Sequence, residues 1–143
     1  MFDQPVRSVM QRRKVLKAPP RTLVSKAASL MAKKNVGAVM VVESGRLVGI
    51  FTERDVVFRV VARGLDAQTT RLAEVMTPAP EIVGPDKPFG YALLLMHERG
   101  FRHLPVIQDG KVIGIVSSRS AMDPELEDFV SEAQRREHFQ RQS

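Results

Sequence analysis

The chain has 143 residues, of which 43% are hydrophobic and 27% charged, and it carries a formal net charge of +6 and no cysteine. This length suits one compact domain or two closely packed half-domains, and the lack of cysteine excludes disulfides and thiolate metal sites. The basic residues are spread along the chain and are not interleaved with aromatic residues, so we do not expect a nucleic-acid-binding protein.

We expect no membrane partner. No apolar run is close to the length needed to cross a bilayer, which is about 18 residues. Residues 1–10 include Asp3 and Pro5 and lack the apolar core of a signal peptide. A cytoplasmic location is expected, and the lack of cysteine fits a reducing compartment.

The first half of the chain predicts an extended segment, a helix, two strands and a second helix. The extended segment covers residues 14–18, and Thr22 is a good N-cap for the helix that follows. Apolar β-branched residues predict buried strands at 36–42 and 47–51, joined by a Ser-Gly turn. The second helix begins at Arg54 or Asp55 and ends near a glycine.

The second half repeats this series after a linker. An extended segment is expected at residues 81–83, then a helix with Pro88 in its first turn. Strands are predicted at 104–107 and 112–116, joined by an Asp-Gly turn. A terminal helix from Glu125 to about residue 139 takes the place of the last helix of the first half.

The two halves are copies of one another. GRLVGI at 45–50 recurs as GKVIGI at 110–115, and TERD at 52–55 recurs as SSRS at 117–120, a constant offset of 65 residues. Each copy is too small for a robust core of its own, so the two must pack together. We therefore predict an α/β (α+β) fold of two β-α-β-β-α repeats related by a pseudo-twofold axis, with clefts at their junction. The predicted divisions are repeat 1 at 6–64, a linker at 65–71, repeat 2 at 72–122, and a C-terminal helix and basic tail at 123–143.

These motifs resemble a CBS domain, and the chain resembles a stand-alone bacterial CBS pair, or Bateman module, over about residues 6–122. The residues behind the resemblance are Val-Met, the helix ending in Leu-Met, Gly-x-x-x-Gly-Ile and Thr-x-Arg-Asp. The resemblance implies clefts that bind AMP, ADP, ATP, NAD-type dinucleotides or S-adenosylmethionine. It also implies a flat homodimer.

The strongest candidate for ligand binding is the segment that contains Thr52, Arg54 and Asp55, where a strand ends and a helix begins. Backbone N–H groups at a helix start attract anions. Asp55 can accept hydrogen bonds from both hydroxyls of a ribose, and the resemblance implies phosphate contacts for the threonine and ribose contacts for the aspartate. The alternative is that Thr52 and Asp55 only cap the helix.

The second copy departs from this pattern. Ser117 keeps the hydroxyl, but Ser120 replaces the ribose-binding aspartate, so we expect two unequal sites. The resemblance to the AMP-sensing regulatory subunit of AMP-activated kinase implies phosphate contacts for Arg102 and His103. With Arg119, they would complete one composite site with Thr52 and Asp55. Alternatively, neither residue contacts a ligand. Arg102 would then lie at a solvent-exposed strand edge, and the His103 ring would be partly buried with its hydrogen bonds satisfied.

The adenine requires an apolar slot. The candidates are Ala18, Val36, Val39 and Ile50, although each is also a plausible core residue.

No catalytic or metal-binding arrangement is evident. The histidines at 97, 103 and 138 are scattered, and no metal-ligand spacing or phosphate-binding loop occurs. We therefore predict a regulatory sensor, not an enzyme, in which an adenine nucleotide (AMP, ATP or NAD) binds between the repeats and signals to an effector protein. The terminal helix is the candidate coupling element, or a simple cap. The alternatives are a dimerisation scaffold with vestigial clefts and, less favoured, a nucleic-acid-binding module.

Overall fold

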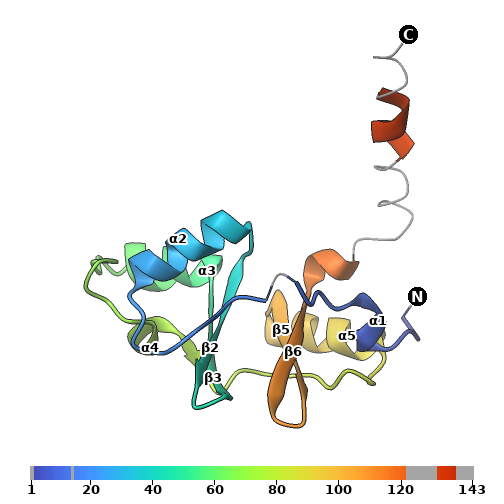
Figure 1. Ribbon diagram of the computed structural model, residues 1–143, viewed down its shortest axis with the longest axis horizontal. Coiled ribbons are helices and arrows are strands. Elements are labelled where there is room, and N and C mark those ends of the chain that lie inside the picture. Colours follow the sequence, from blue (N-terminus) through green and yellow to red (C-terminus); the bar gives the residue numbers. More distant parts are fainter. Residues whose placement is uncertain (1, 14, 122–131, 138–143) are drawn as a thin grey trace.

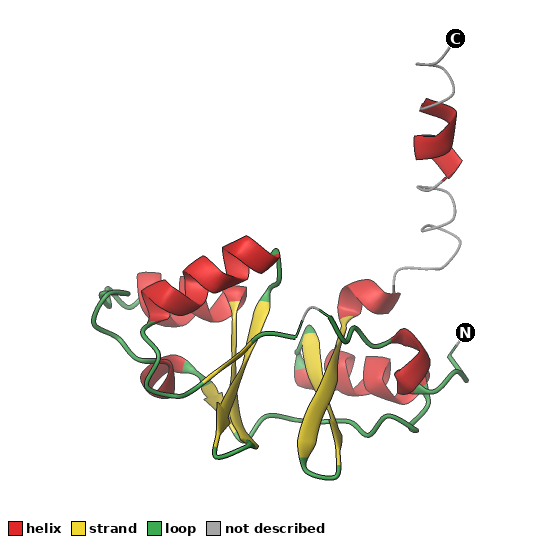
Figure 2. Cartoon of the chain, viewed as in Figure 1, coloured by secondary structure: helices red, strands yellow, loops and turns green. Residues whose placement is uncertain are grey.

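The computed structural model describes residues 2–13, 15–121 and 132–137. Two α/β units lie side by side, with strands in the middle of the molecule and helices on the outside (Figures 1 and 2). Most of the predicted terminal helix falls outside the described residues. Residues 132–137 are helical, and all six of their side chains are exposed.

The first unit is a four-stranded sheet with helices packed on it. In spatial order its strands are β1 (Lys17–Ala18), β2 (Ala38–Glu43), β3 (Arg46–Thr52) and β4 (Thr77–Pro78). The β1–β2 pair is parallel, and the other pairs are antiparallel. Its helical segments are α2 (Val24–Lys34), α3 (Glu53–Asp55), the π-helical η1 (Val56–Val61) and α4 (Leu72–Val75).

The second unit has the same plan in reduced form. Its antiparallel strands are β5 (His103–Gln108) and β6 (Lys111–Ser117), and its helical segments are α1 (Val6–Val9), α5 (Phe89–Arg99) and the 3₁₀-helix η2 (Ser118–Ala121). Single bridges take the place of the outer strands. Val83 pairs parallel with Val106 and Gln11 antiparallel with Ile115, at the positions that β1 and β4 occupy in the first unit.

Both predicted hairpins are confirmed. The central turn residues Ser44 and Gly45 have φ of 51° and 77°, and Asp109 and Gly110 have 52° and 77°. Positive φ at both positions defines the type I′ turn, whose twist suits a two-residue hairpin. The register shifts after Val41 in β2 and after the matching residue of β5, so even the irregularities repeat.

Several predicted boundaries were wrong by a residue or more. Helix α2 begins at Val24 with Leu23 as its N-cap, and Thr22 instead accepts a hydrogen bond from the Leu72 N–H through its backbone oxygen (2.9 Å). Pro88 is the N-cap of α5 and precedes its first turn. In the predicted extended segment 81–83, only Val83 pairs with a strand.

The packing units do not coincide with the sequence repeats. Val6, which is fully buried, belongs to the core around Phe89 and Leu104 in the second unit. Conversely, Leu72 and Val75 of α4 belong to the core of the first unit. Each unit therefore contains a short segment contributed by the other repeat.

A third apolar cluster joins the units. Its buried members come from both sheets, and they are Ala38, Met40, Ile50, Val112 and Ile115. The Lys17 ammonium also reaches across and donates to the Val112 carbonyl oxygen (3.3 Å). This packing fixes the position of each strand end relative to the other repeat, and the two clefts lie at those ends.

Candidate functional site

Two clefts open between the repeats, and each is lined by residues of both. The Thr52 cleft, of about 650 Å³, is lined by Ile50, residues 52–55 and 57–59, Thr77 and residues 100–103. The Ser117 cleft, of about 630 Å³, is lined by Gln11, Ala28, Met31, Ala32, residues 35–38, Glu53, Val56, Arg102, His103, Ile115 and residues 117–119. Both volumes are in the range of small-molecule sites, about 300–1,000 Å³.

The two clefts are related by the pseudo-twofold symmetry. Residues 100–103 line the first cleft and residues 35–38 the second, which is the 65-residue offset of the sequence. The same hydrogen bond closes each repeat at this point. The Glu53 N–H donates to the Gly37 carbonyl and the Ser118 N–H to the Arg102 carbonyl, both at 2.9 Å.

Thr52 and Asp55 hold the helix start in the Thr52 cleft through a reciprocal cap. The Thr52 N–H donates to Asp55 Oδ2 (2.9 Å), and the Asp55 N–H donates to Thr52 Oγ1 (3.4 Å). The Thr52 hydroxyl also donates to Oδ2 (3.3 Å). The capping alternative is therefore part of the structure. The cap does not use all the hydrogen-bond acceptor positions of Asp55, because an ionised carboxylate offers about four of them.

The other carboxylate oxygen of Asp55 faces Arg59. Arg59 Nε lies 3.4 Å from Oδ1, and the guanidinium also donates to the backbone oxygens of Val75 (3.3 Å) and Met76 (3.0 Å). Asp55 is only 8% exposed. Oδ1 thus has the Arg59 contact, whereas Oδ2 accepts from the Thr52 N–H and from the Thr52 hydroxyl.

Aromatic and cationic side chains form the rest of this cleft. The Arg54 guanidinium carbon lies 4.9 Å from the centre of the Phe58 ring, a cation–π distance. Phe101 lies on the opposite repeat beside Arg102. The cleft thus combines an apolar wall, a carboxylate and several cations.

Glu53, Arg102 and His103 line both clefts and form a shared wall between them. A Cβ built on Gly37 would lie 3.0 Å from Glu53 Oε1 and 3.3 Å from His103 Nε2, so these two side chains meet beside that glycine. Burial lowers the pKa of His103, Glu53 raises it, and Arg102 and Arg119 lower it, with a net lowering from 6.5. The imidazole is therefore neutral at pH 7.

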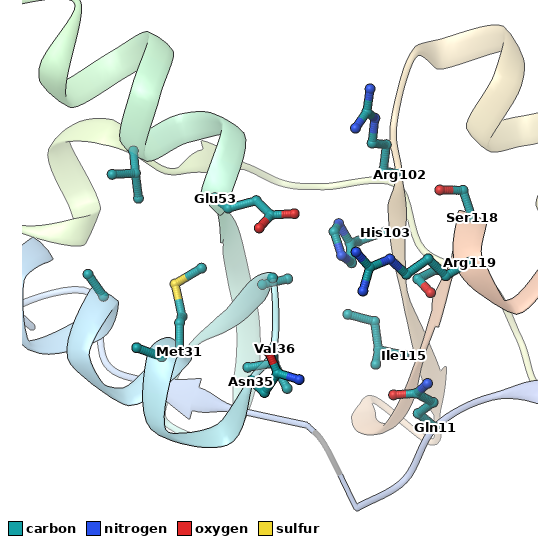
Figure 3. Close-up of a pocket in the computed structure, with 16 residues that line it drawn as sticks. Gln11, Met31, Asn35, Val36, Glu53, Arg102, His103, Ile115, Ser118 and Arg119 are labelled. Carbon is teal, nitrogen blue, oxygen red and sulfur yellow. The ribbon is translucent and has the colours of Figure 1, made fainter. Parts of the chain in front are cut away.

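Figure 3 shows the Ser117 cleft, where Glu53 points across the gap towards His103 and Arg119 reaches in from the second repeat. Met31, Val36 and Asn35 form the facing wall. Glu53 is the only carboxylate among the described residues that line this cleft. The residue equivalent to Asp55 is Ser120, as the sequence indicates.

The structure distributes the eleven candidate residues over three places. The Thr52 cleft contains Ile50, Thr52, Arg54, Asp55, Arg102 and His103. The Ser117 cleft contains Val36, Ser117 and Arg119, together with the shared Arg102 and His103. Ala18 and Val39 are buried in the core of the first unit and line neither cleft. Arg119 therefore does not lie in the same cleft as Thr52 and Asp55.

Sequence reasoning missed the aromatic wall of the Thr52 cleft, which Phe58 and Phe101 provide. The repeat offset could have indicated Phe101, because this residue occupies in the second repeat the position that Val36, a candidate for the adenine slot, occupies in the first. Among the described residues, no cluster of histidine and carboxylate side chains could hold a metal ion, and no helix is long and apolar enough to span a bilayer.

Comparison with known proteins agrees with this architecture. The family model described as "CBS domain" matches residues 6–62 and again 72–124. The chain belongs to the CBS domain family. The CBS domain-containing protein YhcV of Bacillus subtilis is 39% identical over 98 residues, which cover 68% of this chain and 69% of YhcV.

Another relative matches this chain over only a small part of its own length. The "Meiotically up-regulated gene 70 protein" of Schizosaccharomyces pombe is 40% identical over 71% of this chain, but the match is 16% of its own length. Among solved structures, a conserved protein from Pyrococcus horikoshii superposes with a TM-score of 0.80 at 28% identity, covering 85% of this chain and 92% of that one. The CBS pair of MJ0100, solved with 5′-methylthioadenosine and S-adenosyl-L-methionine, has a TM-score of 0.75 over 82% of this chain and 92% of its own, and its 24% identity shows the shared fold alone.

Proposed function

We propose that this CBS pair is a regulatory sensor, not an enzyme, and that it binds an adenine nucleotide such as AMP, ATP or NAD in the Thr52 cleft. The observation that carries the proposal is the composition of that cleft. The cleft is lined by Asp55 of one repeat and by Phe101 and Arg102 of the other. A ribonucleotide presents a diol, a phosphate and a flat base, and these three groups match the three side chains.

Each part of the nucleotide has a chemical counterpart. Asp55 Oδ1 accepts from the ribose hydroxyls, which are neutral donors to a charged acceptor. Arg102 and Arg54 are both exposed and can approach the phosphate with planar guanidinium groups. Phe101 and Ile50 cover the adenine, an apolar contact that their half-buried and buried positions allow.

The regulatory output follows from the composite cleft. A ligand that contacts both repeats binds best to one relative arrangement of them and shifts the population towards it. Such coupling between sites is typically about 1–3 kcal/mol. An effector protein that contacts both repeats would detect the shift.

We further propose a homodimer. Val57 and Val61 of η1 are 55% and 68% exposed and are four residues apart, so they share one face of the segment. Phe58 beside them is 59% exposed. Light scattering of the protein and of Val57→Ser should show a dimer that the substitution weakens. A monomer at micromolar concentration in the unsubstituted protein contradicts this assignment.

Calorimetry with AMP, ATP and NADH tests the nucleotide site. We expect at least one of them to bind and Asp55→Ala to weaken binding about tenfold or more, since hydrogen bonds to charged groups contribute about 1.5–3 kcal/mol. Ser120→Ala at the equivalent position is the matched control and should leave the Thr52 cleft unaffected. A melting curve of each variant separates loss of the cap from loss of the ligand contact.

Two results contradict the proposal. If none of the three nucleotides binds, a dimerisation scaffold with vestigial clefts is favoured. Binding of nucleic acid with a steep salt dependence, uncompeted by free AMP, favours a nucleic-acid-binding module.

A further inference from the structure

Glu53 places a negative charge without a close cation in the Thr52 cleft. Its side chain is exposed and lines the cleft together with Arg102 and His103. None of the ion pairs among the described residues includes Glu53. Asp55, the other carboxylate among the described residues of this cleft, differs because Arg59 Nε lies 3.4 Å from its Oδ1. A ligand in the cleft therefore meets the full charge of Glu53.

The local backbone determines where this carboxylate lies. The Glu53 N–H donates to the Gly37 carbonyl oxygen (2.9 Å), which holds the start of α3 against the segment before β2. The carboxylate lies over the same glycine, because a Cβ built on Gly37 would be 3.0 Å from Glu53 Oε1 and 3.3 Å from His103 Nε2. Figure 3 shows Glu53 pointing across the gap towards the second repeat. The negative charge thus faces the repeat that contributes Arg102 to the cleft.

The fold does not require a carboxylate at this position. The equivalent residue of the second repeat is Ser118. Its N–H donates to the Arg102 carbonyl oxygen at 2.9 Å, the distance of the matching bond from Glu53 to Gly37. Both residues therefore begin a helical segment in the same way with different side chains. What the glutamate adds is its charge in the cleft.

The cations that a phosphate could use in this cleft are few. Arg59 is held by an ion pair and by two backbone oxygens. His103 is neutral at pH 7, because burial lowers its pKa. Arg54 and Arg102 remain, and the charge of Glu53 opposes them. This balance suits a phosphate of low charge better than a chain of several phosphates.

We propose that Glu53 is a specificity-determining residue of the Thr52 cleft and makes it select nucleotides of low negative charge, such as AMP, over ADP and ATP. This inference rests on the proposed nucleotide site and names the class of nucleotide that the site takes. Each further phosphate adds charge that the Glu53 carboxylate repels. Salt screens this repulsion only partly at separations below the Debye length, about 8 Å at physiological ionic strength.

Calorimetry of the full chain with AMP and ATP at pH 8 in EDTA tests the selection. We expect the unsubstituted protein to bind AMP at least as tightly as ATP. Glu53→Gln should raise the affinity for AMP about threefold and for ATP about tenfold, the effect of removing one partly screened charge a few ångströms away. The event to follow is the one that Asp55→Ala weakens, because Asp55 lines this cleft alone.

Three controls separate the charge of Glu53 from other effects. Glu53→Asp keeps the charge, so the ratio of the AMP and ATP affinities should stay within about twofold of the unsubstituted protein. Glu43→Gln changes the net charge equally, but Glu43 is at the far end of β2, roughly 16 Å from the cleft end by the usual strand rise, and both affinities should stay unchanged. Excess Mg²⁺ neutralises part of the charge of ATP and should bring its gain in Glu53→Gln towards that of AMP.

Protonation of His103 does not account for the expected gain. Glu53 raises the pKa of His103, so its removal lowers that pKa further. The imidazole is therefore neutral at pH 8 with and without Glu53. A higher affinity in Glu53→Gln then reports the lost carboxylate and not a new cation.

The outcomes separate this inference from the proposed function. Tighter binding of ATP than of AMP by the unsubstituted protein overturns the inference, and so do equal gains for AMP and ATP in Glu53→Gln or the same gains in Glu43→Gln. In each of these cases the proposed function stands. If neither AMP nor ATP binds, the inference fails, and the proposed function fails with it unless NADH binds.

Discussion

Gly114→Ala tests whether the N-terminal segment of repeat 1 packs on repeat 2. A Cβ built on the buried Gly114 would lie 2.8 Å from Met10 Sδ and 3.0 Å from the Gln11 carbonyl oxygen. The Gln11 oxygen is held in place, because it accepts from the Ile115 N–H (3.0 Å) and the Gln11 N–H donates to the Ile115 oxygen (2.9 Å). The added methyl group must therefore displace a thioether and strain a strand pair.

The expected cost is about 1–3 kcal/mol, the usual penalty for overpacking. It is reduced by the smaller conformational entropy of alanine in the unfolded chain, about 0.4–1 kcal/mol. The measurement is urea unfolding of the full chain. Gly84→Ala is the matched control, because a Cβ there meets nothing within 4 Å, and its stability should not fall.

The double substitution Gly114→Ala with Met10→Ala isolates the contact between the two segments. Loss of the Met10 thioether makes room for the new methyl group, so the pair should cost less than the sum of the single variants by about 1 kcal/mol. Additivity within about 0.5 kcal/mol would show that Met10 does not pack on Gly114, and the exchange of segments between the repeats would be refuted.

Three further predictions concern stability. Leu72→Ala should cost about 2–5 kcal/mol in urea unfolding, since Leu72 is fully buried, and a cost under 1 kcal/mol would contradict its place in the first core. Arg59→Ala should lower the free energy of unfolding by about 1 kcal/mol, and Arg59→Lys should lower it less, because the guanidinium contacts Asp55 and the backbone after α4. Equal stability of the unsubstituted protein and both variants would contradict this prediction. Burial lowers the pKa of His103, so the unfolded chain takes up a proton first and stability falls as the pH drops below 6.5. His103→Gln should flatten that decline in thermal melts at pH 7.5 to 5.5, and an unchanged slope would count against it.

The fold was predictable because its signals are local and occur twice. Hairpin turns, strand lengths and the 65-residue offset can all be read from short stretches of sequence. The exchange of α1 and α4 between the cores could not be read in this way. Val9-Met10 and Val75-Met76 are visible as a repeat, but which sheet each pair covers depends on contacts between distant segments.

The site was predicted in part, and the errors at Ala18 and Val39 have one cause. The side chains for phosphate and sugar contacts were predicted to come from both repeats. Thr52, Asp55, Arg102 and His103 do line one cleft. The adenine slot was sought within repeat 1 alone, and Ala18 and Val39 instead lie in its core. Burial in the core and lining of a cleft use the same apolar residue types, so composition could not separate them.

The shared wall makes the two clefts physically dependent on each other. Glu53 comes from repeat 1, and Arg102 and His103 come from repeat 2, yet all three line both clefts. An anion in one cleft that attracts Arg102, or that stabilises a His103 imidazole protonated from the solvent, therefore changes the charge that a ligand meets in the other cleft. Because the wall includes both repeats, the same change alters the contact between them. If both clefts bind ligands, occupancy of either one would act on the same three side chains at the repeat junction.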